Sequence, residues 1–273
     1  MSISSLPSLI GLTNSQRSLQ LSLARLASGR RINGAADDPA GLVISQQLKS
    51  YTSGLEQARD NTEIGMSIAQ TADGGLEQTQ SILQQQRELA LQAANTGAMD
   101  DNQRSALNAQ FQALSKSLDQ IAANTTFAGR PLLDGSFRGK NLQIGASADN
   151  TVQMDISTSV SGQPAGFGSK GLGLAGLDLS NTEDALKRLD AASEAVNQQR
   201  GTLGALQANT LQTNANSLAV SHENLLSAYS TIADTDYARE SAAMASNLIR
   251  NQAGMAMLAQ GNQNAGRVLQ LLR

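Results

Sequence analysis

Few side chains of this 273-residue protein could carry out acid–base, nucleophilic or metal chemistry. Cysteine is absent and His222 is the only histidine, so the sequence lacks the residues of a Cys/His zinc site. As a single imidazole, His222 could serve as a general base. It shares a secondary position of a seven-residue apolar repeat with Ala208, Ala215 and Tyr229, and this placement favours a packing or interface role.

Asp37 with Asp38, and Asp234 with Asp236, could be paired carboxylates for acid–base work. Both groups stand where one helical pattern ends and another begins, so they are better explained as capping residues that accept hydrogen bonds from free backbone N–H groups. The glycines of 161–177 precede no Lys-Ser or Lys-Thr ending and do not form a phosphate-binding loop. The sequence therefore predicts no enzyme, no cofactor and no metal ligand.

The composition is typical of long, thin helical packing. The sequence has 20 lysines and arginines and 23 acidic residues. All the acidic residues lie between residues 37 and 240, so arginine is the only charged residue type in 1–36 and 241–273. Aromatic residues make up 3% and tryptophan is absent, which argues against a thick globular core. We find no apolar run long enough for a membrane span and no secretory h-region at the N-terminus.

Apolar residues recur every seven positions through most of the sequence, which predicts long helices packed lengthwise in coiled-coil fashion. A compact bundle of ordinary amphipathic helices is the alternative. The repeat shifts by one residue near Gly201 and Gly204. The clearest members are Leu12, Leu19 and Leu26, then Leu48, Leu55, Leu76 and Leu83, then Leu107, Leu114 and Ile121, then Leu189, Val196 and Leu203, and finally Leu211, Leu218 and Leu225.

Helix boundaries follow from capping residues and glycines. Asp38–Pro39 predicts the start of a long second helix that ends at 95–97, and Asp100 or Asp101 starts the third. A period of two within 138–160 predicts a β-hairpin, and Ser180 or Asn181 starts the next long helix. The predicted fold class is mainly α, with long coiled-coil-like helices, an antiparallel folding-back of the chain and a small β-hairpin.

The apolar stripes at the two ends are too narrow to be buried well within one copy, and a narrow stripe alone leaves its helix frayed. Other copies would complete the burial, and a heterologous contact that does not close gives a helical filament. We therefore expect the ends to become ordered on polymerisation. The candidate assembly residues are Leu9, Leu12, Leu19, Leu23, Leu26, Leu248, Met255, Leu258, Leu269 and Leu272.

The arginine-rich, acid-free ends admit other interpretations. Residues 1–36 have the composition of a mitochondrial transit peptide, but the same character returns at 241–273, where no transit signal belongs. Basic amphipathic helices also lie on membranes, although the polar faces here are mostly Ser, Gln and Asn. Seven scattered arginines without aromatic partners make a poor nucleic-acid footprint. We expect neither membrane insertion nor nucleic-acid binding.

Several separated stretches resemble the signatures of bacterial flagellins, and the similarity extends over about 1–160 and 180–273. The stretches read LASGRRIN at 26–33, DDPAG at 37–41, NTTFAG at 124–129, IADTDYA at 232–238 and VLQLLR at 268–273. Their signature residues include Gly29, Arg31, Asn33, Asp37, Asp38, Gly41, Asp234 and Asp236.

The resemblance implies a filament subunit that is exported unfolded by a flagellar type III apparatus and polymerises outside the cell. It further implies an export chaperone, a filament cap and hook-junction proteins as partners. Residues 161–179 stand where many members carry large outer domains, so the protein looks like a minimal flagellin. A hook–filament junction protein is a related alternative, and a host-facing secreted binding module is an alternative from another class.

The same resemblance divides the sequence into two interleaved domains. An inner-tube domain takes 1–42, which includes a connecting spoke, and 233–273. An outer-tube domain takes 43–180, with the hairpin at about 138–160 and the Gly-rich loop 161–177, and its C-terminal helix is 181–232.

A stretch at 84–92 resembles the segment by which an animal innate immune receptor recognises flagellins. Arg87, Glu88 and Leu89 fit the pattern, whereas Gln85 and Gln110 stand where well-recognised members carry Arg and Glu. Losing a charged donor and a charged acceptor removes the stronger, charge-assisted hydrogen bonds. We expect weak recognition by this receptor.

Overall fold

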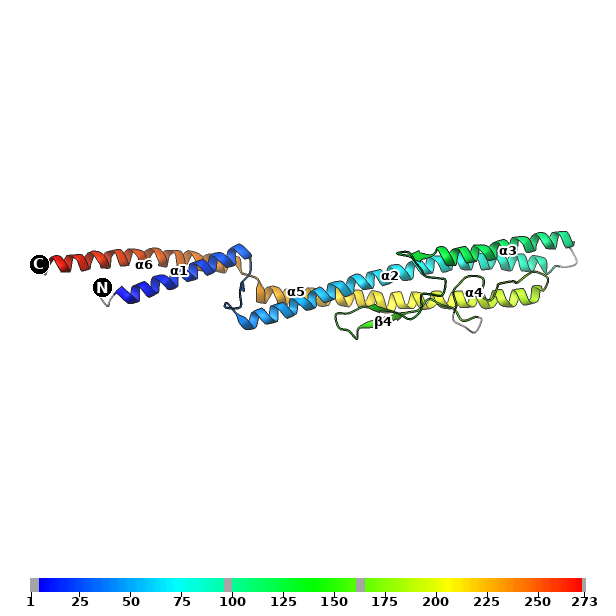
Figure 1. Ribbon diagram of the computed structural model, residues 1–273, viewed down its shortest axis with the longest axis horizontal. Helices are drawn as coiled ribbons and strands as arrows, with labels where there is room; N and C mark the ends of the chain where they lie inside the picture. The colour runs from blue at the N-terminus through cyan, green and yellow to red at the C-terminus, as the bar shows by residue number, and fades with distance from the viewer. Residues whose placement is uncertain (1–4, 96–99, 161–164, 272–273) are drawn as a thin grey trace. The chain divides into compact units, whose positions relative to one another are not determined.

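A computed structural model describes residues 5–95, 100–160 and 165–271 of the protein. It divides into two compact units: Met1–Thr52 with Glu223–Arg273 forms the first, and Ser53–His222 forms the second. The helices are α1 (Ser5–Ser28), α2 (Pro39–Ala93), α3 (Asp101–Asn124), α4 (Thr182–Ala205), a π turn η1 (Leu206–Leu211), α5 (Gln212–Ala233) and α6 (Tyr237–Leu271) (Figure 1). The strands are β1 (Thr126–Phe127), β2 (Arg130–Pro131), β3 (Lys140–Gln143) and β4 (Thr151–Met154).

The predicted fold class is confirmed, and the helices start where capping residues predict them. A carboxylate oxygen of Asp38 accepts a hydrogen bond from the Gly41 N–H at 2.9 Å, beside the first residue of α2. Asp100 forms a capping box with Gln103 at the start of α3, because each side chain accepts the other's backbone N–H. The predicted end of the second helix at 95–97 lies partly outside the described residues. Within these residues, no helix is both long and apolar enough to span a membrane.

The core of the second unit is formed by the apolar repeats of α2, α3 and α4. The fully buried side chains include Leu76, Leu83, Phe111, Leu118 and Leu189. These residues lie on the seven-residue repeats, or interleave with them, so the packing of this unit follows the sequence pattern closely.

The described part of the Gly-rich loop adds to this core. Phe167 and Leu172 are fully buried, so the segment is a packed cover rather than a loose connection. Polar side chains on one face of α3 hold its backbone: Asp119 accepts from the Ser169 N–H at 2.8 Å, and Gln112 donates to the Leu177 carbonyl at 2.5 Å. The glycine-rich segment is therefore buried without leaving these backbone groups unpaired.

The predicted hairpin is confirmed. Strands β3 and β4 pair antiparallel from Lys140 opposite Met154 to Gln143 opposite Thr151. A second antiparallel pair, β1 with β2, lies between α3 and β3.

The shift in the seven-residue repeat corresponds to the π turn η1. Leu203 and Leu211 are both buried although eight residues separate them instead of seven. A π turn holds about one residue more than an α turn, so η1 absorbs the extra residue and keeps both leucines on the same face.

Candidate assembly interface

Helices α1 and α6 of the first unit pack against each other in antiparallel fashion. Three contacts define the register: Arg25 with Glu240 at 3.7 Å, the Ser15 hydroxyl with the Asn247 carbonyl at 3.2 Å, and Leu12 beside Gly254. A Cβ atom on Gly254 would lie 3.4 Å from Leu12, which is an ordinary van der Waals contact.

Polar side chains occupy the centre of this helix pair. Among the described side chains of α1 and α6, the buried ones are Ser22 and Asn251. A buried polar residue in a helix seam fixes register at a cost in stability. The pair therefore lacks the fully buried apolar core found in the second unit.

The candidate assembly residues fall into two groups. Leu12, Leu19, Leu26 and Leu258 are half-buried, whereas Leu9, Leu23, Leu248 and Met255 are exposed. Leu269 lies in α6, but its side chain, like Leu272, is outside the described residues.

Further large apolar side chains on the pair are exposed. Ile249 is 65% exposed and Met257 is 74% exposed, and Ile10 on α1 is also solvent-accessible. Such a concentration of exposed apolar side chains on two adjacent helices is typical of an interaction surface. The candidate assembly residues taken from the apolar repeat do not include Ile10, Ile249 or Met257.

The family-signature residues gather where α1 and α6 join the rest of the first unit. The segment after α1 pairs with the segment before α6: the Arg31 N–H donates to the Ala233 carbonyl at 2.7 Å, and the Thr235 N–H donates to the Gly29 carbonyl at 2.9 Å. Arg30 and Asp234 consequently form an antiparallel bridge. The structure thus brings together residues more than 200 positions apart in the sequence.

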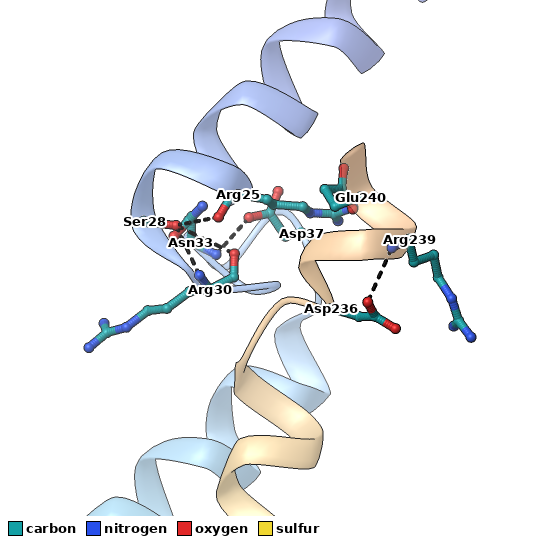
Figure 2. A network of polar contacts seen from close by, with 8 residues as sticks. All are labelled: Arg25, Ser28, Arg30, Asn33, Asp37, Asp236, Arg239 and Glu240. Carbon is teal, nitrogen blue, oxygen red and sulfur yellow. Dashed lines mark hydrogen bonds and ion pairs between the residues drawn. The ribbon is translucent and has the colours of Figure 1, made fainter. Parts of the chain in front are cut away.

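Two aspartates of this cluster accept hydrogen bonds from nearby backbone N–H groups. Asp236 caps α6 by accepting from the backbone N–H groups of Ala238 and Arg239, and Figure 2 shows the latter bond. Asp37 accepts from the N–H groups of Asn33 and Gly34, each at 3.0 Å. The predicted capping role of Asp236 is confirmed, and these two carboxylates are engaged with backbone N–H groups rather than arranged as an acid–base pair.

Two glycines of the signature are required by the local geometry. Gly29 has φ of +70°, a conformation that strains other residues, and a Cβ atom there would lie 3.1 Å from the Tyr237 hydroxyl. At Gly41 a Cβ atom would lie 2.7 Å from Ile32 and closer still to the Asp38 carboxylate that binds the Gly41 N–H. A larger side chain at either position would displace a neighbouring side chain.

Sequence reasoning missed the ion pair that closes one end of the helix pair. Arg25 lies in the last turn of α1 and Glu240 in the first turn of α6, and Figure 2 shows their side chains side by side. Each charge is favourable at its own helix end. The sequence did contain a signal for this ion pair, namely a basic residue in the last turn of α1 and an acidic residue in the first turn of α6. These two turns meet when the helices pack antiparallel.

The receptor-like residues of the second unit divide between two surfaces. Gln85, Glu88, Leu89 and Gln110 line one groove between α2 and α3. Arg87 instead forms an ion pair with Asp190 of α4.

His222, the candidate general base, is half-buried in α5.

Long helices and a helix pair with exposed apolar side chains are typical of a protein that packs against other protein surfaces. The comparisons with known proteins specify its family. The family model of the bacterial flagellin N-terminal helical region matches residues 2–138, and that of the C-terminal helical region matches 186–272.

Individual relatives agree over nearly the whole sequence. A flagellin of Bacillus subtilis (strain 168) is 38% identical, over 99% of this chain and 98% of the relative. A flagellar filament 30.7 kDa core protein of Treponema maltophilum is 35% identical, over 97% and 95%. The crystal structure of Bacillus cereus flagellin is 28% identical and covers 58% of this chain and 88% of its own, with a TM-score of 0.45. The chain belongs to the bacterial flagellin family, and it is a structural subunit of the flagellar filament.

Proposed function

We propose that the exposed apolar surface of the α1–α6 pair is where subunits meet one another as the filament grows. The proposal rests on which side chains of this pair are buried. Polar Ser22 and Asn251 are buried, while apolar Ile249 and Met257 are exposed. Burying a large apolar side chain stabilises by about 1.5–3 kcal/mol. Several such residues on each subunit provide a driving force that the lone subunit leaves unused.

The proposal extends to the life of the subunit outside this contact. The protein is exported unfolded by the flagellar type III apparatus, with a chaperone, and polymerises outside the cell beneath a filament cap on hook-junction proteins. Its role is structural, without catalysis. Membership of the flagellin family supports these steps.

A charge placed on the exposed apolar surface tests the contact. Ile249→Asp is preferable to a change at half-buried Leu258, because the exposed position tolerates the carboxylate in the lone subunit. In the assembled filament an unpaired buried carboxylate costs several kcal/mol. We expect normal helical circular dichroism but no long filaments by electron microscopy after seeding.

Gln252→Asp is the matched control, since it adds the same charge at an exposed polar position three residues away. It should weaken polymerisation much less than Ile249→Asp. Filaments of normal length and yield from Ile249→Asp would contradict the proposed contact surface.

We also propose that the innate immune receptor recognises this protein weakly. Gln85 and Gln110 offer the receptor no charge, and Arg87 is already paired with Asp190 of the same molecule. The double substitution Gln85→Arg and Gln110→Glu should raise receptor activation by purified monomer in a reporter cell assay by about tenfold or more, because charge-assisted hydrogen bonds are the stronger ones. Equal activation by the parent and the double variant would count against the proposal.

A further inference from the structure

The loop between α1 and α2 contains an asparagine–glycine dipeptide, Asn33–Gly34, which is the only one in the sequence. Asn33 is exposed to water. Glycine after asparagine gives the least hindered path to spontaneous deamidation, because its backbone nitrogen has no neighbouring Cβ atom that obstructs attack on the asparagine amide.

The fold does not explain why glycine stands at position 34. A Cβ atom there would meet nothing within 4 Å, whereas Gly29 and Gly41 in the same region have no room for one. The φ angle of Gly34 also lies outside the left-handed region that Gly29 occupies. Alanine would therefore fit at 34 without strain, and it would lower the entropy of the unfolded state.

Asp37 accepts a hydrogen bond from the Gly34 N–H, whose nitrogen would attack Asn33 in deamidation. One of its carboxylate oxygens accepts the Gly34 N–H at 3.0 Å and the Asn33 N–H at 3.0 Å, and the Asp37 N–H donates to the Gly34 carbonyl at 3.1 Å (Figure 2 shows Asn33 and Asp37 joined). The reaction requires the Gly34 nitrogen to lose this proton and turn toward the Asn33 amide. A carboxylate that accepts this N–H opposes the loss of the proton and the rotation of the nitrogen, because it stabilises the proton and fixes the turn.

We propose that Asn33–Gly34 is a site of spontaneous deamidation that the folded loop suppresses, with Asp37 as the positioning residue. In the reaction the Gly34 nitrogen bonds to Cγ of Asn33, the bond between Cγ and Nδ2 breaks, and Nδ2 leaves as ammonia. Water then opens the succinimide to aspartate or isoaspartate. The only co-reactant is water.

The product weakens the structure that suppressed its formation. Deamidation adds a negative charge next to Asp37, in a part of the sequence where residues 1–36 otherwise contain no acid. Two carboxylates competing for the same backbone N–H groups repel each other. Isoaspartate additionally lengthens the backbone by one carbon atom between the residue-33 and Gly34 nitrogens, so the two N–H groups that share one Asp37 oxygen lose their spacing.

The test follows the mass of the peptide that contains Asn33 and the ammonia released, during incubation of the purified full-length protein at neutral pH. The parent should deamidate at least about tenfold more slowly folded than in urea, as for any reaction that requires local opening. Asp37→Ala removes the acceptor and should bring the rate of the folded protein close to the rate in urea. Gly34→Ala should slow the reaction in both conditions and leave the fold intact.

Asp38→Ala is the matched control, because Asp38 binds the Gly41 N–H and not that of Gly34. It should leave deamidation at Asn33 unchanged. Hydrogen exchange of the Gly34 amide separates a direct effect from unfolding: Asp37→Ala should lose protection at Gly34 while α1 and α2 keep theirs. Equal rates for folded and unfolded parent, or an unchanged rate in Asp37→Ala, would overturn the proposal.

Discussion

At the residue scale, the polar side chains that first suggest chemistry turn out to organise the backbone. Asp38, Asp100 and Asp236 accept backbone N–H groups in the first turns of α2, α3 and α6, where no intrahelical acceptor exists. A catalytic carboxylate pair would need two such groups facing a common cleft, and these face their own helices. Acidic residues at helix boundaries are therefore positional signals in this protein.

Gly29 gives a prediction at this scale. Gly29→Ala forces a Cβ atom into φ of +70° and against the Tyr237 hydroxyl, so we expect a loss of about 1–2 kcal/mol in the free energy of unfolding. Urea denaturation followed by circular dichroism measures the change. Gly34→Ala in the same loop is the control, because that position has room and no positive φ, and its stability should be unchanged or slightly higher.

At the element scale, the helices keep apolar residues in line even where the repeat is interrupted. Between Leu203 and Leu211 the π turn η1 takes up one extra residue, and Asn214 just beyond it donates to the Ile144 carbonyl at 2.6 Å. Without such a turn, every later residue would be rotated by about 100° around the helix axis. The π turn thus keeps the apolar residues of the repeats before and after it facing the same core.

A pair of single-residue deletions tests this role of η1. Deleting exposed Asn209 restores a spacing of seven between Leu203 and Leu211, so the variant should fold with a midpoint of thermal unfolding equal to or above that of the parent. Deleting exposed Asn197 in α4 should lower the midpoint strongly, because it rotates the buried leucines that follow away from the core. Equal effects of the two deletions would show that η1 does not absorb the extra residue.

At the scale of the whole molecule, the two units differ in how much apolar surface a single subunit buries. The core of the second unit is drawn entirely from residues between Ala69 and Leu211, so it needs no other part of the molecule. The α1–α6 pair of the first unit has half-buried leucines around a polar centre. Stability should therefore be distributed unevenly, with local opening concentrated in the pair.

Removal of 241–273 tests this difference. The truncated protein should keep a soluble helical second unit with a cooperative thermal transition, because that core is untouched. It should form no filaments, since α1 loses both its intramolecular partner and half of the proposed contact surface. Electron microscopy beside the full-length protein measures this, and normal filaments from the truncated protein would refute the role of the pair in assembly.

The sequence by itself determined the features that depend on short-range chemistry. Asp38, Asp100 and Asn181 indicated helix starts because a cap involves residues at most a few positions apart. The repeats through Leu76, Leu83 and Leu189 indicated the core of the second unit, because helical periodicity alone decides which residues share a face. The one-residue shift near Gly201 was visible too, although not the π turn that accommodates it.

Only the tertiary structure decided the features that depend on which distant surfaces meet. Phe167 of the Gly-rich loop is buried in the core of the second unit, and an α3 side chain pairs the backbone of that loop. Arg87 faces Asp190 of α4, and the Gly29 carbonyl meets Thr235 from the opposite end of the sequence. A stripe of leucines on α1 or α6 does not reveal how much of it the other helix covers, because burial is a property of the packed pair and not of either helix alone.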